Sequence, residues 1–217
     1  MLIQDYISND FPVFEPSTSV DEALACVQGF GFTHVFIKNN GSFQGGICKE
    51  FLEECEGGTL AEVMIHLEKF AILYENTILD SIKLFHTFNA NVVPVINESE
   101  DYLGYIAYDD VFCELSKYPL FSESGALLTV ETPLRNFSMT EIAKIVEGNN
   151  SKFYGAFISN ITEETIQVTM KISNENLSSV DETFERYGYL IARKFYTDEK
   201  EALLKDRYQF MQKYLEI

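Results

Sequence analysis

The sequence predicts an α+β protein built from consecutive small modules, and three observations lead to that prediction. The apolar and polar pattern of residues 1–58 recurs, at a spacing of 58 residues, in residues 59–118. Residues 125–197 follow with strand and helix patterns in a different order. Hydrophobic residues form 46% of the 217 positions, which is enough to bury a sizeable core.

The repeat is carried by pattern rather than by identical residues. Placed 58 residues apart without a gap, the two copies match at apolar, glycine and cysteine positions: Leu2 with Leu60, Val20 with Ile78, Val35 with Val93, Gly46 with Gly104, and Cys55 with Cys113. Self-similarity at a fixed spacing indicates a duplicated supersecondary unit, so we expect both copies to fold alike.

Each copy predicts the same order of elements. A short extended piece, at residues 12–15 and 71–74, precedes a helix. That helix opens with a capping box, Ser19–Glu22 in the first copy and Thr77–Asp80 in the second, in which hydroxyl and acid satisfy free backbone amides. An apolar strand, a polar turn, a second strand and a final helix follow, which gives the order β-α-β-β-α.

Residues 125–197 predict the order β-α-β-β-α-β of a ferredoxin-like module. Capping boxes at Ser138–Glu141 and Ser179–Glu182 open its two helices. Residues 198–217 then place apolar side chains at helical spacing, which predicts an amphipathic C-terminal helix. The strand patterns of the module occupy residues 125–134, 152–161, 164–173 and 189–196.

Charge and composition argue against several kinds of partner. Asp and Glu total 34 against 16 Lys and Arg, and the net charge of −18 disfavours nucleic acid and anionic membranes, which are both polyanions. The longest apolar runs are far too short to span a bilayer. The N-terminus lacks a signal-peptide pattern, so we expect a cytoplasmic protein whose four cysteines are reduced.

Two stretches of the second copy carry a resemblance to a known family. Val93-Pro94-Val95 matches the apolar strand with a central proline of cystathionine-β-synthase-type (CBS) domains. Gly104 to Asp110 matches the glycine–apolar–apolar–Thr/Ser–x–x–Asp turn of the same family. The tandem repeat of about 115 residues therefore resembles a CBS domain pair. Residues 125–197 resemble an ACT domain in element order, and the whole layout is similar to the acetoin-utilisation accessory protein family.

The resemblance implies a regulatory protein, usually dimeric, that binds an adenosine compound in the cleft of the CBS pair. In that family the Asp of the turn accepts hydrogen bonds from ribose hydroxyls, and Asp110 stands at that position. An ionised carboxylate can accept both hydroxyl hydrogens. Ala107 stands at the Thr/Ser position and loses the contact that a hydroxyl makes, while Val93 and Pro94 complete the implied ligand-binding set.

The other implied sites are weaker. The ungapped alignment places Lys49 at the Thr/Ser position of the first copy and Leu52 at the Asp position, so that half lacks a ribose clamp. Lys49 remains a candidate phosphate contact as a point charge. In the third module the first strand–helix turn has no glycine, which argues against an amino-acid site there. Arg135 in this turn either meets a carboxylate or is solvated.

Two interpretations remain open. In the first, the chain is a regulatory sensor of an adenosine ligand; in the second, it is a non-catalytic scaffold whose clefts bind no nucleotide. Asp110 also suits the start of a helix, where the dipole favours negative charge. No cofactor is expected, and His34, His66 and His86 lack metal-ligand spacing. No catalytic constellation is present, so we expect a non-enzyme. We also expect a homodimer, because the resemblance to a flat CBS pair implies helix faces that need a partner.

Overall fold

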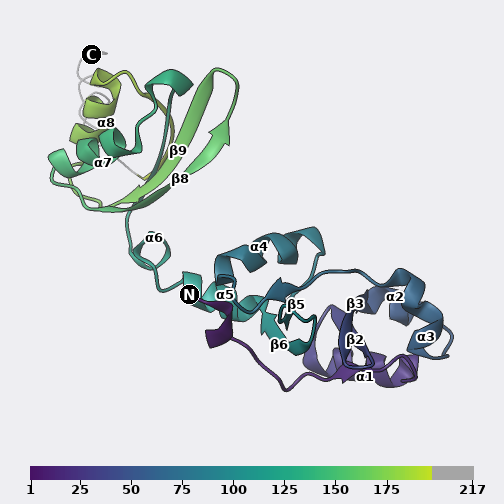
Figure 1. Cartoon of the computed structure of the whole chain (residues 1–217). Helices are drawn as coiled ribbons and strands as arrows, with labels where there is room; N and C mark the ends of the chain where they lie inside the picture. Colours follow the sequence, from purple (N-terminus) through teal and green to yellow (C-terminus); the bar gives the residue numbers. More distant parts are fainter. Residues whose placement is uncertain (197–217) are drawn as a thin grey trace, which may run out of the picture. The chain divides into compact units, whose positions relative to one another are not determined.

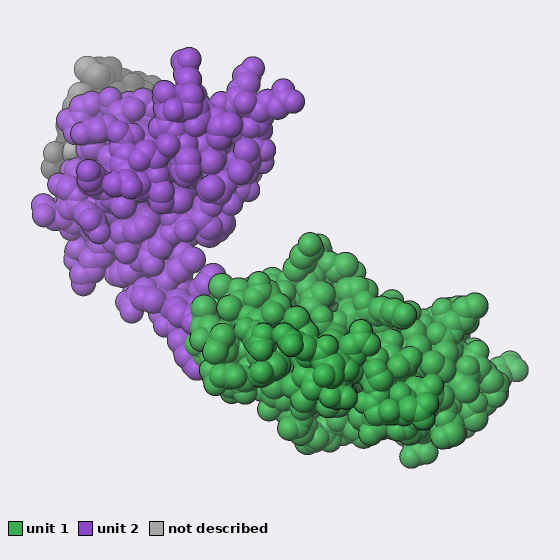
Figure 2. Space-filling view, viewed as in Figure 1, with its two compact units in different colours: residues 1–115 green, residues 116–217 purple. Residues whose placement is uncertain are grey.

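The structure is a computed structural model that describes residues 1–196, so the expected C-terminal helix at residues 198–217 lies outside the described residues. The chain divides into two compact units, Met1–Leu115 and Ser116–Ile217 (Figure 2). Both units contain helices and strands, which confirms the predicted mixture of α and β elements.

Unit 1 consists of two copies of one arrangement (Figure 1). In each copy a short first strand pairs in parallel with the second strand, which pairs antiparallel with the third. The first copy contains η1 (Ile3–Asp5), β1 (Val13–Phe14), α1 (Val20–Phe30), β2 (His34–Asn39), β3 (Ser42–Cys48) and α2 (Lys49–Glu53). The second contains α3 (Leu60–Val63), η2 (Met64–His66), β4 (Ile72–Leu73), α4 (Ile78–Thr87), β5 (Val92–Ile96), β6 (Tyr102–Ala107) and α5 (Tyr108–Leu115).

The two long helices of unit 1 begin where the sequence predicts. Ser19 Oγ accepts a hydrogen bond from the backbone N–H of Glu22 at 3.2 Å and starts α1. Thr77 and Asp80 form the predicted capping box of α4, in which Asp80 Oδ2 accepts from Thr77 N at 2.9 Å and from Thr77 Oγ1 at 2.6 Å. These bonds lower the pKa of Asp80 below its ordinary value.

The prediction of a repeat without a gap is wrong beyond the first strand of each hairpin. His34 pairs with Cys48, whereas Val92 pairs with Ala107, so the offset is 58 residues on one strand and 59 on the next. The turn of the second hairpin is longer, because residues 97–101 separate the paired Ile96 and Tyr102 while residues 39–42 occupy the same place in the first copy. The ungapped alignment of the two copies gives no sign that the second turn has one extra residue.

The two copies exchange their leading segments, residues 1–12 and 59–71, while each copy keeps its own three-stranded sheet. Ser8, which lies before β1 in the first copy, exchanges backbone hydrogen bonds of 2.9 Å with Tyr105 on β6 of the second. Glu68, which lies before β4 in the second copy, exchanges bonds of 2.8 and 3.0 Å with Gly46 on β3 of the first. One continuous core runs through both copies, with Phe36, Ile47 and Ile106 fully buried in it.

Unit 2 has the predicted order of strands and helices. Its elements are α6 (Pro119–Ser122), β7 (Ala126–Pro133), η3 (Leu134–Asn136), α7 (Met139–Gly148), β8 (Phe153–Ile161), β9 (Thr165–Ile172), α8 (Leu177–Arg186) and β10 (Leu190–Phe195). The strands form an antiparallel sheet in the order β10-β7-β9-β8. Helices α7 and α8 cover one face of this sheet (Figure 1), where Ile142 and Phe184 pack against Leu128 and Met170.

One of the two predicted helix starts in unit 2 is wrong. Ser138 caps α7 as predicted, and its Oγ accepts from Glu141 N at 3.2 Å. Helix α8, however, begins at Leu177, two residues before the predicted capping residue Ser179. Asn176 holds the cap position in the left-handed conformation, with φ of 55°. Ser179 is already inside the helix, where its carbonyl accepts a 2.7 Å bond from Thr183 Oγ1.

Candidate functional site

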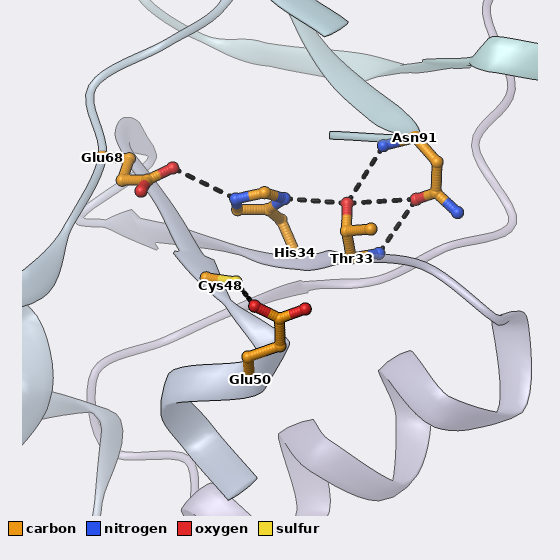
Figure 3. A network of polar contacts seen from close by, with 6 residues as sticks. All are labelled: Thr33, His34, Cys48, Glu50, Glu68 and Asn91. Carbon is orange, nitrogen blue, oxygen red and sulfur yellow. Dashed lines mark hydrogen bonds and ion pairs between the residues drawn. The ribbon is translucent and has the colours of Figure 1, made fainter. Parts of the chain in front are cut away.

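A polar network joins the two repeats at the centre of unit 1 (Figure 3). Thr33 and Asn91 occupy equivalent positions, 58 residues apart, and bind each other reciprocally. Thr33 N donates to Asn91 Oδ1 at 2.9 Å, and Asn91 N donates to Thr33 Oγ1 at 3.0 Å. The pair therefore marks an approximate two-fold axis between the copies, and it satisfies backbone amides that precede β2 and β5.

His34 extends this network to the segment of the second copy that precedes β4 (Figure 3). Its Nδ1 lies 2.9 Å from Thr33 Oγ1 and its Nε2 lies 3.1 Å from Glu68 Oε2. A carboxylate can only accept, so the hydrogen of the neutral ring belongs on Nε2, and Thr33 Oγ1 donates to Nδ1. Burial lowers the pKa of His34 below its ordinary value, against the opposing effect of the Glu68 carboxylate.

Asp110 lies at the strand-to-helix turn where β6 meets α5. Its carboxylate is half-buried, and Oδ2 accepts a hydrogen bond from Ala107 N at 3.3 Å. The side chain thus supports the start of its own helix, which is the alternative role that the sequence offered. The second oxygen, Oδ1, is not used in that bond. Ala107 is half-buried directly beside it at the end of β6.

Val93 and Pro94 lie inside the sheet. Val93 is 0% exposed and pairs with Ile106, while Pro94 is buried and pairs with Tyr105. The preceding residue, Val92, pairs with Ala107, so β5 holds the strand end that carries the Asp110 turn. The four residues therefore lie on the adjacent elements β5, β6 and α5, where Val93 belongs to the core and Pro94 is buried.

Lys49 does not occupy the position that the ungapped alignment gave it. The observed register makes Cys48 the counterpart of Ala107, and it makes Phe51 the counterpart of Asp110. Lys49 is the first residue of α2, and its Nζ lies 3.9 Å from Glu53 Oε1 one turn along the helix. The first repeat therefore has neither a hydroxyl nor a carboxylate at the two positions of the family's turn.

A cavity of about 320 Å³ lies elsewhere in unit 1, near the two hairpin turns. None of the predicted site residues lines it; its walls are Phe43, Gln44, Lys69, Phe70, Ala71, Ile96 and Glu100. The residue opposite Phe70 is Gly46, whereas the equivalent position in the other half holds the large side chain of Tyr105. At Gly46 the ring of Phe70 comes close to the backbone, so the ring takes the space that a side chain would need there.

The opposite half of unit 1 is filled by aromatic side chains. Phe11 is 1% exposed and packs edge-on against Phe32, Phe36 and Tyr105 at centroid distances of 5.0 to 6.1 Å. Tyr105 Oη donates to Asp10 Oδ1 at 2.5 Å. Burial and this carboxylate raise the pKa of Tyr105 to about 12, so the phenol stays protonated as a donor.

In unit 2, a groove of about 500 Å³ follows the outer side of α7 and α8, and it includes Lys144, Asn149 and Arg186. Arg135 is exposed in η3 and is not among the residues that line the groove. Across residues 1–196, no group of three or more His, Cys, Asp or Glu side chains is placed to hold a metal ion. No helix in that part of the chain has the length and apolar character needed to cross a bilayer.

Comparisons with known proteins give matches among solved structures alone. No family model matches the sequence, and a search of curated proteins finds no significant match. The similar solved structures include a CBS domain pair/ACT domain protein from Thermotoga maritima, with 23% identity, a TM-score of 0.47, and coverage of 53% of this chain and 96% of that one. A second CBS domain-containing protein from Thermotoga maritima has 18% identity and a TM-score of 0.47, covering 54% and 95%. The crystal structure of CBSX2 in complex with AMP has 15% identity and a TM-score of 0.45, covering 52% and 95%.

Proposed function

We propose that the chain is a regulatory ligand-sensing protein whose unit 1 is a CBS domain pair that binds an adenosine nucleotide or a related metabolite. The observation that carries the proposal is the position of Asp110. Its half-buried carboxylate lies at the start of α5, is fixed through one oxygen by Ala107 N, and keeps a second oxygen for a ligand. A fixed carboxylate oxygen is suited to accept hydrogen bonds from the hydroxyls of a ribose.

The charges around the turn favour some adenosine compounds over others. Asp109 and Asp110 both lie in the first turn of α5, and the side chain at position 107 has no hydroxyl to bind a phosphate. Two carboxylates disfavour a highly charged polyphosphate at this place, although the helix dipole opposes that effect. We therefore expect S-adenosylmethionine, which carries a positive charge, to bind more tightly than ATP.

The proposal extends to the rest of the molecule. In this proposal unit 2 is an ACT-like domain, and its β-α-β-β-α-β order and its sheet order support that architecture. Unit 2 then responds to the ligand state of unit 1. The chain acts as a homodimer in the cytoplasm and performs no catalytic step. The overall layout then corresponds to that of the acetoin-utilisation accessory proteins.

The test is isothermal titration of the full chain with AMP, ADP, ATP and S-adenosylmethionine. We expect at least one of them to bind, and we expect Asp110→Ala to weaken that binding by roughly tenfold or more, the effect of losing a hydrogen bond to a charged group. Asp109→Ala is the matched control, because it removes a neighbouring exposed carboxylate and should preserve ribose recognition. Equal binding by the wild type and Asp110→Ala would reject Asp110 as the ribose acceptor.

A scaffold without nucleotide binding is the second candidate. It is favoured by the use of Asp110 as a helix cap, by the ion pair of Lys49 with Glu53, and by the aromatic filling around Phe11. In that case none of the four compounds produces heat while the protein stays folded. The same titration therefore separates the two functions.

A further inference from the structure

The groove of unit 2 lies between the two neighbouring helices α7 and α8 (Figure 1). Its volume of about 500 Å³ is within the range of small-molecule sites, which is about 300–1,000 Å³. Polar groups dominate its lining, among them the hydroxyls of Ser138 and Thr140, the carboxylate of Glu141 and the cationic groups of Lys144 and Arg186. Such a lining favours a charged ligand that forms hydrogen bonds over an apolar one.

Arg186 is held at the groove by a buried hydroxyl. Thr183 is 8% exposed, and its Oγ1 accepts a hydrogen bond from Arg186 Nη2 at 3.1 Å. The same hydroxyl donates to Ser179 O at 2.7 Å, so the acceptor of the arginine is itself fixed. A guanidinium has five N–H donors, and the bond to Thr183 uses one of them. The remaining donors are suited to bind an oxyanion through two parallel hydrogen bonds.

Lys144 supplies a second positive charge to the groove from the other helix. It is exposed on α7, whereas Arg186 belongs to the last turn of α8. In the part of the chain that the structure describes, neither of the two cations forms an ion pair. Both charges therefore remain available to a ligand, and two cations from neighbouring helices suit a ligand that carries two negative charges.

Glu141 adds a fixed hydrogen-bond acceptor to the same groove. Its Oε2 accepts a hydrogen bond from Tyr189 Oη at 2.8 Å, and Tyr189 is 4% exposed. Burial and this carboxylate raise the pKa of Tyr189 above its ordinary value, so the phenol stays protonated as a donor. The second oxygen, Oε1, is not used in that bond. A carboxylate at this place repels a simple anion, whereas a hydroxyl of the ligand can donate to it.

We propose that the groove between α7 and α8 binds a small hydroxylated dianion, which is either a phosphate ester or a hydroxy dicarboxylate. Arg186 and Lys144 bind the anionic groups, and Glu141 accepts a hydrogen bond from the hydroxyl. The site lies within unit 2 and contains none of the residues proposed to bind an adenosine compound in unit 1. Unit 2 therefore has a ligand of its own, in addition to the ligand of unit 1.

The experiment is isothermal titration of the full chain with glycerol 3-phosphate and with malate, which distinguish the two kinds of dianion. We expect one of them to bind, and we expect Lys144→Gln with Arg186→Gln to weaken that binding by about tenfold or more, as the loss of charged hydrogen bonds does. Lys152→Gln with Arg135→Gln is the matched control. It changes the net charge of the chain equally, at two exposed positions that do not line the groove, and should bind as the wild type does.

Each result decides one part of the proposal. The absence of heat from both compounds at millimolar concentration would overturn the site, and an equal loss in both double variants would assign the binding to overall charge. Succinate, which lacks the hydroxyl of malate, and inorganic phosphate should bind less tightly than their hydroxylated counterparts; equal binding would reject the role of Glu141. Should the groove variant fail to fold, Lys144→Gln alone decides. Neither compound contains adenosine, so these results are independent of the test of unit 1.

Discussion

His34 is 1% exposed, yet both of its ring nitrogens have polar partners from different parts of unit 1. Thr33 Oγ1 can donate either to His34 Nδ1 at 2.9 Å or to Asn91 Oδ1 at 3.1 Å. Protonation of the ring makes Nδ1 a donor, and the Thr33 hydroxyl then turns toward Asn91. The network keeps its hydrogen bonds in both states, so the cost of protonation comes from burying charge.

We predict that His34 makes the stability of unit 1 depend on pH. Its pKa in the folded state lies below the ordinary 6.5, so the folded protein binds fewer protons than the unfolded chain. The stability that this group contributes is present above about pH 6.5 and is lost as the pH falls toward the folded pKa. Urea unfolding from pH 7.5 to 5 should show this slope in the wild type and a smaller slope in His34→Gln. Identical slopes would contradict the prediction.

At the scale of elements, two glycines hold the leading segments against the opposite hairpins. Gly45 and Gly104 are equivalent in the corrected register and have φ of 147° and 143°. A Cβ on Gly45 would lie 2.7 Å from Glu68 O, and one on Gly104 would lie 2.5 Å from Ser8 O. Both atoms belong to backbone that crosses from the other repeat. Only glycine permits this close approach in this conformation.

We predict that Gly104→Ala destabilises unit 1 by about 1–3 kcal/mol, through the strained φ and the contact with Ser8. Gly29→Ala is the matched control, since Gly29 lies inside α1 with open space around its Cβ position. That exchange should be neutral or stabilising by up to about 1 kcal/mol. Thermal and urea unfolding of the two variants measure the difference. Equal effects of both exchanges would show that the crossing segment moves without cost.

At the scale of the whole molecule, each unit has its own hydrophobic core. The core of unit 1 draws on both repeats, because each leading segment pairs with a strand of the other copy. A single repeat would thus lack the segment that pairs with its third strand, and it would expose its half of the shared core. The repeat is a unit of sequence, whereas residues 1–115 are the unit of folding.

We predict that residues 1–115 fold alone and that residues 1–58 do not. The larger fragment should unfold cooperatively in urea and disperse its amide NMR signals, since it contains both crossing segments. The smaller fragment should show no cooperative transition. A folded 1–58 fragment would mean that the crossing pairs at Ser8 and Glu68 contribute little.

The sequence by itself determined the mixture of elements, their order in both units, and the starts of α1, α4 and α7 at Ser19, Thr77 and Ser138. These features depend on apolar periodicity and on bonds between residues three apart, so a single local stretch contains them. The same local signal failed at α8, where the left-handed Asn176 starts the helix before the expected Ser179.

Only the tertiary structure decided how the copies correspond and where the open space lies. Because the second turn has one extra residue, the counterpart of Ala107 is Cys48 rather than Lys49. The backbone pairing shows this shift, whereas the sequence alignment does not. The cavity lined by Phe70, the link of His34 to Glu68 and the edge-on contact of Phe85 on α4 with Tyr108 on α5 unite residues distant in the chain. Such contacts follow from how strands pair and helices pack across the two-fold axis, and no local pattern encodes that geometry.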